Sequence, residues 1–200
     1  GSPTDMVYDS KGNLFVSTHS YDRIVKIAPD GTQTNFAGSG ESGYTEGLGE
    51  LAQFSTPAGL AIGKNDTLYV ADYSNNVIRK ISPDGKVTTL AGSGSEGSID
   101  APGAAASFDN PTYLEILSDG TLLVADAGNN KIRSITPMGE VATYAGSGLS
   151  GHTDGTGASA SFNSPFGLEL DKNDNAYVTE ADGSIRIISP ETVVTTFREA

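Results

Sequence analysis

The sequence predicts an all-β fold made of four copies of one four-stranded antiparallel unit. Three observations lead to this prediction. A proline recurs every 54 residues, at Pro3, Pro57, Pro111 and Pro165, and the segments that follow these prolines align. Each segment consists of short runs rich in Val, Ile, Leu, Thr and Tyr, separated by Asn, Asp, Gly and Pro, a pattern typical of strands and turns. The 25 glycines among 200 residues indicate many turns.

The second repeat shows the unit clearly. Its apolar runs predict strands over 60–62, 67–71, 77–81 and 86–90, with turns between them. An antiparallel unit of this length is typical of one blade of a β-propeller. We therefore expect one domain over 1–200, a propeller or propeller segment. Its four blades are expected at about 3–40, 57–94, 111–148 and 165–200, joined by 16-residue connectors.

The connectors share the pattern Gly-x-x-[Asp/Glu]-x-x-Gly-x-x-Ala-x-Phe, as in Gly97 to Phe108. We expect the Ala and Phe of each copy to pack one turn of irregular or helical chain against a blade. The start of each connector also contains G-x-G-x-x-G, the spacing of a dinucleotide-binding loop. That loop occurs once in a βαβ unit and opens a helix, whereas this chain has three copies without a helical pattern. The glycines are therefore interpreted as bends between blades, and no cofactor is predicted.

The motifs "LYVADYSNNVIRKI", "LLVADAGNNKIRSI" and "VTTLAGSG" resemble NHL repeats, and the resemblance recurs over the whole chain. The inserted "DGTGASASFNSPFGL" is similar to the long connector of bacterial and plant NHL proteins. The resemblance implies a propeller, which in this family usually has six blades. Four repeats are consistent with a fragment of a longer propeller, with a closed four-bladed ring, or with self-association of chains to complete a ring.

The chain is strongly acidic, with 25 acidic and 12 basic residues and a formal charge of −13. Such a chain repels phosphate backbones and anionic membranes, so neither nucleic acid nor a membrane is expected as a partner. Cysteine is absent, which is compatible with any compartment. No leader is visible, but Gly1 and Ser2 could be an expression scar. The compartment is left open, with an extracellular or periplasmic location favoured.

One column of the repeats is acidic at the end of the second strand, where Asp72, Asp126 and Glu180 align with Thr18. These carboxylates are expected either to accept hydrogen bonds from the following turn or to contribute to a binding face. The stretches that contain the connectors lack Lys and Arg, which predicts an acidic connector face. The basic residues Arg79, Lys80, Lys131 and Arg133 are placed on the third strands. Tyr73 and His19, in the loop after the second strand, are further candidates on the connector face.

A second candidate site lies on the first strands, which border the central channel of a propeller. Glu115 and Glu169 share a column there and could form an acid–base pair or be solvated by water. Tyr113 and Phe166 lie nearby, and exposed aromatic side chains among acids suit contact with a protein or a glycan.

Catalytic and metal signatures are sparse. The two histidines, His19 and His152, occupy non-equivalent repeat positions and cannot supply three histidine ligands to a zinc ion. No metal site is therefore predicted. We expect a non-enzymatic binding or scaffold module that contacts a protein or glycan through its connector face. An NHL-like lyase or lactone hydrolase with a metal in the channel, and a repeat scaffold without a ligand, remain as alternatives.

Overall fold

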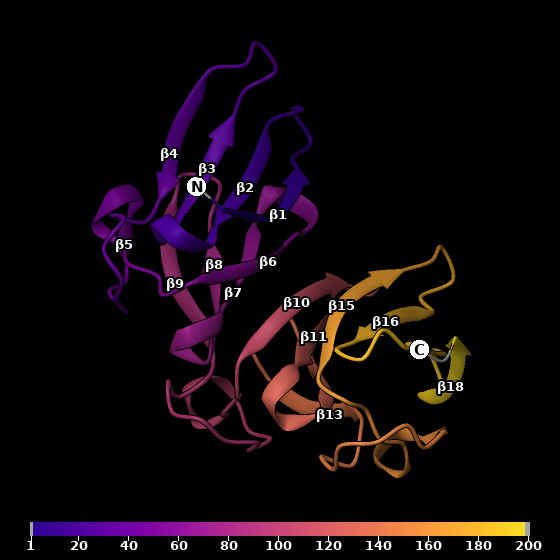
Figure 1. Cartoon of the computed structure of the whole chain (residues 1–200). Helices are drawn as coiled ribbons and strands as arrows, with labels where there is room; N and C mark the ends of the chain where they lie inside the picture. The colour runs from indigo at the N-terminus through magenta and orange to yellow at the C-terminus, as the bar shows by residue number, and fades with distance from the viewer. Residues whose placement is uncertain (1, 199–200) are drawn as a thin grey trace.

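The computed structural model describes residues 2–198, which form four antiparallel sheets, one from each repeat (Figure 1). The chain is all-β, as predicted, and each repeat contributes four strands that pair in chain order. The strands are β1 (Pro3–Tyr8), β2 (Leu14–Thr18), β3 (Arg23–Ile27) and β4 (Gln33–Ala37) in blade 1; β6 (Pro57–Ile62), β7 (Leu68–Asp72), β8 (Val77–Ile81) and β9 (Lys86–Ala91) in blade 2; β10 (Pro111–Ile116), β11 (Leu122–Asp126), β12 (Lys131–Ile135) and β13 (Val141–Ala145) in blade 3; and β15 (Pro165–Leu170), β16 (Ala176–Glu180), β17 (Ile185–Ile188) and β18 (Val193–Arg198) in blade 4.

The first strand of each blade starts earlier than the apolar pattern predicts. In blade 2 it begins at Pro57, which pairs with Asp72, and the register shifts between Pro57 and Leu60. The same irregularity follows the corresponding proline in the other blades. A bulge adds a residue to one strand and bends it, so simple alternation of apolar residues does not extend to the start of the strand.

The connectors contribute strands that the sequence did not predict. β5 (Gly47–Leu48) pairs with β9, and β14 (Gly155–Thr156) pairs with β18, so blades 2 and 4 have five strands. In blade 3 the equivalent contact is a single bridge between Pro102 and Glu140. Short 3₁₀ turns complete the loops: η1 (His19–Tyr21), η2 (Gly49–Leu51), η3 (Lys64–Asp66), η4 (Tyr73–Asn75), η5 (Gly103–Ala105), η6 (Ala127–Asn129) and η7 (Gly157–Ser159). None of the helices within residues 2–198 has the length and apolar character to cross a bilayer.

The apolar core lies between successive blades, in three clusters. Each cluster includes the Ala-x-Phe pair of the connector that runs between the two blades, and these side chains are inaccessible to solvent, as expected: Ala52 and Phe54, Ala106 and Phe108, and Ala160 and Phe162. Each connector is thus wedged between the blade that it leaves and the blade that it enters.

The first strands of neighbouring blades pack side by side in the order β1, β6, β10 and β15, and they line the axis (Figure 1). Gly59 marks a close approach, because a Cβ atom there would lie 2.6 Å from the Cα of Tyr113. The hydroxyl of Tyr113 donates a hydrogen bond of 2.9 Å to the carbonyl of Thr4. Blade 3 is therefore tied to blade 1 across the axis.

Candidate functional site

Buried ion pairs connect the second and third strands of blades 2 and 3. Asp72 Oδ2 lies 2.9 Å from Arg79 Nη1, and Asp126 Oδ2 lies 2.7 Å from Arg133 Nη1, with all four side chains buried. Each arginine also donates hydrogen bonds to carbonyl groups of the preceding connector, and its guanidinium lies over the connector's phenylalanine ring at 5.2–5.3 Å. Each arginine thus fixes a connector as well as neutralising an acid.

The acids hold the C-terminal end of the same connector. The second carboxylate oxygen of Asp72 accepts a hydrogen bond from the amide of Ser55, and that of Asp126 accepts one from the amide of Asp109, both at 2.8 Å. Asn75 completes the network in blade 2, because its amide nitrogen donates both to Asp72 Oδ2 and to the carbonyl of Gly43. Asn129 does the same in blade 3.

This network shows that two sets of residues expected from the sequence to contribute to the charge of the surface are buried. Asp72 and Asp126 are inaccessible to solvent, so they anchor the connector face without being exposed on it. Arg79 and Arg133 are equally buried, although the sequence placed them with the other basic residues of the third strands. A signal was present in the repeats, because acid and arginine occur together in blades 2 to 4 and are both replaced in blade 1, by Thr18 and Val25.

The candidates on the loops lie apart from one another. His19 lies on η1 of blade 1 and is exposed, while Tyr73 lies on η4 of blade 2 and is half-buried. Phe166 is 50% exposed on β15, and its ring lies 5.3 Å from the ring of Tyr113. The structure therefore brings Tyr113 and Phe166 together near the axis, but it does not join them to His19 or Tyr73.

The two glutamates of the first strands face a cavity of about 430 Å³ at the axis. Its wall includes Asp5, Glu115 and Glu169 together with Tyr113, and no basic residue among residues 2–198 lines it. The rest of the wall is largely apolar and comes from several blades: Met6, Val7, Leu60, Leu168, Tyr177, Ile185 and Phe197. Asp5 was missed in the sequence because it aligns with Gly59, Tyr113 and Gly167, a column without repeated acids.

Two carboxyl groups of this cavity, those of Asp5 and Glu115, are harder to ionise than free carboxyl groups. Burial raises the pKa of Glu115 to about 7, and the negative charges of Glu169 and Asp5 add to the effect. Burial also raises the pKa of Asp5, against hydrogen bonds from the amides of Leu60 and Met6. The pKa of the Tyr113 phenol is raised by burial and by Asp5. A cation in the cavity would relieve this repulsion.

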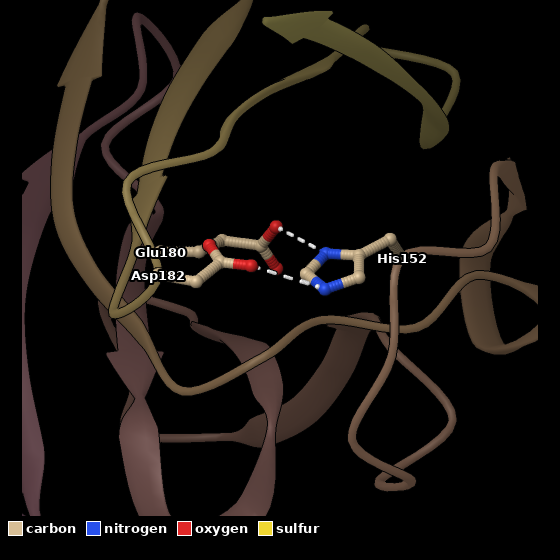
Figure 2. A group of neighbouring side chains, drawn as sticks. All are labelled: His152, Glu180 and Asp182. Carbon is tan, nitrogen blue, oxygen red and sulfur yellow. Dashed lines mark hydrogen bonds and ion pairs between the residues drawn. The ribbon is translucent and has the colours of Figure 1, made fainter. Parts of the chain in front are cut away.

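Blade 4 departs from this pattern around its acid. Glu180 takes the place of aspartate, and Arg186 Nη1 lies 3.7 Å from Glu180 Oε2, farther than in the other two pairs. The loop is one residue shorter and lacks the bridging asparagine. His152 of the connector takes its place: Nδ1 lies 3.3 Å from Glu180 Oε2, and Nε2 lies 3.1 Å from Asp182 Oδ2 (Figure 2). One imidazole thus stands between two carboxylates.

Comparison with known proteins agrees with the repeat architecture. The sequence model of the NHL repeat matches residues 54–81, which span most of blade 2. The chain is 32% identical over 181 residues to NHL repeat-containing protein 2 of Gallus gallus. The match covers 82% of this chain and 25% of the chicken protein, so the chain spans about a quarter of the length of that relative.

Solved propeller structures share the fold at low identity. A catalytically inactive virginiamycin B lyase from Staphylococcus aureus, solved with quinupristin, superposes with a TM-score of 0.68 at 18% identity, covering 98% of this chain and 55% of the lyase. An auxiliary nutrient binding protein from Bacteroides ovatus superposes with a TM-score of 0.68 at 16% identity, covering 98% of this chain and 47% of the other. With the repeat match, the NHL relative and the four blades, this chain is identified as a member of the NHL-repeat β-propeller family.

Proposed function

We propose that the chain is a binding module that accepts a basic side chain of a protein partner in its axial cavity. The observation that carries the proposal is the convergence of Asp5, Glu115 and Glu169 on one partly apolar cavity without a basic residue among its described lining. An ammonium or guanidinium group would compensate the charges, while its methylene groups would contact the apolar wall. The volume of about 430 Å³ is ample for one such side chain.

The charge of the whole chain supports the same class of partner. A formal charge of −13 produces a field that attracts basic proteins and accelerates their association. The exposed Phe166, packed against Tyr113, offers an apolar contact beside the cavity. Structural similarity to a nutrient binding protein supports a binding role for this fold, although fold alone does not determine the ligand.

Binding of short peptides, measured by fluorescence polarisation, tests this proposal. A peptide with one lysine between neutral residues should bind to the wild type, and the same peptide with acetyl-lysine should bind at least tenfold more weakly. The double variant E115Q/E169Q should lose the preference for the charged lysine. The matched control E41Q/E96Q removes the same amount of charge from exposed connector positions and should retain the preference for the charged lysine. Equal loss in both double variants would show attraction by net charge alone and would contradict the cavity as the site.

One observation favours a second function, an enzyme that uses acid–base chemistry. A carboxyl group with a pKa of about 7, such as Glu115, can both donate and accept a proton near neutral pH. The structural similarity to a lyase is consistent with this role. Turnover of a lactone or cyclic ester that disappears in E115Q, and depends on pH with a midpoint near 7, would favour the enzyme over the binding module.

A further inference from the structure

We propose that His152, Glu180 and Asp182 form a binding site for a divalent transition-metal cation of the zinc type on blade 4. One ligand atom from each residue lies within 4.8 Å of the others. One imidazole nitrogen and two carboxylate oxygens are a donor set that zinc accepts, with a fourth position left to water. The site is separate from the axial cavity, whose lining includes none of these three residues.

The first argument is that Glu180 is less well satisfied than its equivalents. In blades 2 and 3 the inner carboxylate oxygen accepts two hydrogen bonds of 2.7–2.9 Å, from an arginine and an asparagine. In blade 4 the corresponding Oε2 has two longer contacts, of 3.3 Å to His152 and 3.7 Å to Arg186, although the side chain of Glu180 is inaccessible to solvent. A buried anionic oxygen whose contacts are all this long has capacity for a cation.

The second argument is charge. In blade 3 the buried acid Asp126 and the connector acid Asp100 share Arg133. In blade 4 Arg186 is likewise shared, at 2.7 Å from Asp154 and 3.7 Å from Glu180, but Asp182 adds a further negative charge without a further base. With a neutral imidazole the cluster in blade 4 is therefore one unit more negative than that in blade 3.

The third argument is that three changes from the repeat pattern meet at one point. Glutamate replaces aspartate at 180, the loop is shortened so that Asp182 follows closely, and histidine stands at 152 where the aligned connectors have Tyr44 and Ser98. The longer acid, the second acid and the imidazole together supply a set of metal ligands. In the other blades, a single asparagine is enough to hydrogen-bond the connector to the buried acid.

The geometry leaves room for an ion with a small adjustment. Donor atoms of a tetrahedral zinc site are roughly 3.3 Å apart for bonds of about 2.0–2.1 Å. The separation of Nδ1 and Oε2 is already 3.3 Å, but Asp182 faces the other ring nitrogen (Figure 2). His152 and Asp182 are 48% and 30% exposed, so water and ions reach the site from the connector face. Because the three ligand atoms already lie within 4.8 Å of one another, binding would require the Asp182 carboxylate to turn toward the side of Nδ1 and Glu180.

Titration with Co²⁺, followed by visible absorption, tests the site because cobalt replaces zinc and reports its ligands. We expect one Co²⁺ per wild-type chain, displaced by Zn²⁺. H152N and D182N should each weaken binding at least tenfold. The matched control H19N removes the other histidine, which is exposed on blade 1, and should bind as the wild type. Asparagine at 152 keeps a hydrogen-bond donor near Glu180, and circular dichroism should show that the fold is kept.

Two results would overturn the proposal. One is Co²⁺ binding that H152N and D182N change less than threefold. The other is an absence of binding up to millimolar Co²⁺. In that case the histidine only bridges the two carboxylates and is not a metal ligand.

Discussion

Asp72 and Arg79 form an ion pair that is closed to solvent, with Oδ2 and Nη1 2.9 Å apart and neither side chain exposed. The two residues lie on the neighbouring strands β7 and β8, and both contact the connector that precedes their blade. The pair therefore joins two strands of blade 2 to the segment that arrives from blade 1. Removing one partner leaves the other charged, buried and unpaired.

Replacing Arg79 by methionine should lower the free energy of unfolding by about 3–5 kcal/mol, because Asp72 would lose its buried counter-charge. Urea denaturation followed by circular dichroism measures the change. K80M, on the adjacent position of the same strand with a half-buried side chain, should cost less than about 1 kcal/mol. The double variant D72N/R79M should recover part of the loss, and strictly additive effects would contradict coupling between the two residues.

Truncating Phe108 to alanine should destabilise the protein by about 3–5 kcal/mol. The ring is fully buried in the cluster between blades 2 and 3, and the Arg133 guanidinium lies over it at 5.2 Å. The control I99A shortens an exposed side chain of the same connector. Thermal unfolding of the two variants should separate them clearly, and a similar small shift for both would show that the connector is not part of the core.

Substituting Gly59 by alanine should destabilise the contact between the first strands of blades 2 and 3. The added methyl group would meet the backbone of Tyr113 at 2.6 Å and the carbonyl of Thr112 at 2.7 Å, and backbone atoms cannot turn away. Overpacking of this kind costs about 1–3 kcal/mol or more. Gly31 has a positive φ of 85° but open space around its Cβ position, so G31A should cost about 1 kcal/mol. Melting temperatures in the reverse order would contradict this packing.

The stability difference between E115Q and the wild type should depend on pH. The pKa of Glu115 is raised from 4.5 to about 7 in the folded protein. A raised pKa means that the folded state holds the proton more tightly, so this group favours folding below pH 4.5 and loses that contribution as pH rises through 7. The side chain of E115Q cannot ionise. Between pH 5 and pH 8, the free energy of unfolding of E115Q should therefore rise relative to that of the wild type by roughly 1–2 kcal/mol, after allowance for the partial exposure of the group.

Urea denaturation at the two pH values measures this gain. E41Q removes an exposed charge on a connector, and its difference from the wild type should change little over the same range. A constant difference for E115Q would show that the carboxyl group titrates as in the unfolded chain.

The fold was predictable because the same pattern of strands and turns recurs in all four repeats. The prolines and turn residues mark the blades, and the strands of blade 2 match the predicted ranges to within one residue except at their first strand. The strands β5 and β14 were not predictable, since each has two residues and pairs with a strand about 40 residues later in the chain. Pairing of this kind depends on the path of the connector, and that path depends on how its phenylalanine packs.

The sites were only partly predictable, because the sequence reports types of residue and not their exposure. Glu115 and Glu169 were recognised from their place on the first strands. The structure adds Asp5, which lines the same cavity because the first strands of the blades lie side by side. Asp72 and Arg79 look like surface charges in a list of residues, yet both are buried. His152 is separated from Glu180 by 28 positions, and no periodic pattern connects a connector residue to a strand end.

The short strands of the connectors have a consequence for solubility. The outermost strand of a blade exposes a row of unpaired amide and carbonyl groups, which can pair with another chain and start aggregation. β5 and β14 occupy part of that row on β9 and β18, and Pro102 contacts Glu140 at the corresponding place in blade 3. Each of these blades is thus shielded at its rim by the segment that precedes it. Lengthening or loosening a connector should therefore raise the tendency to form intermolecular β-sheet, even where the blade itself remains folded.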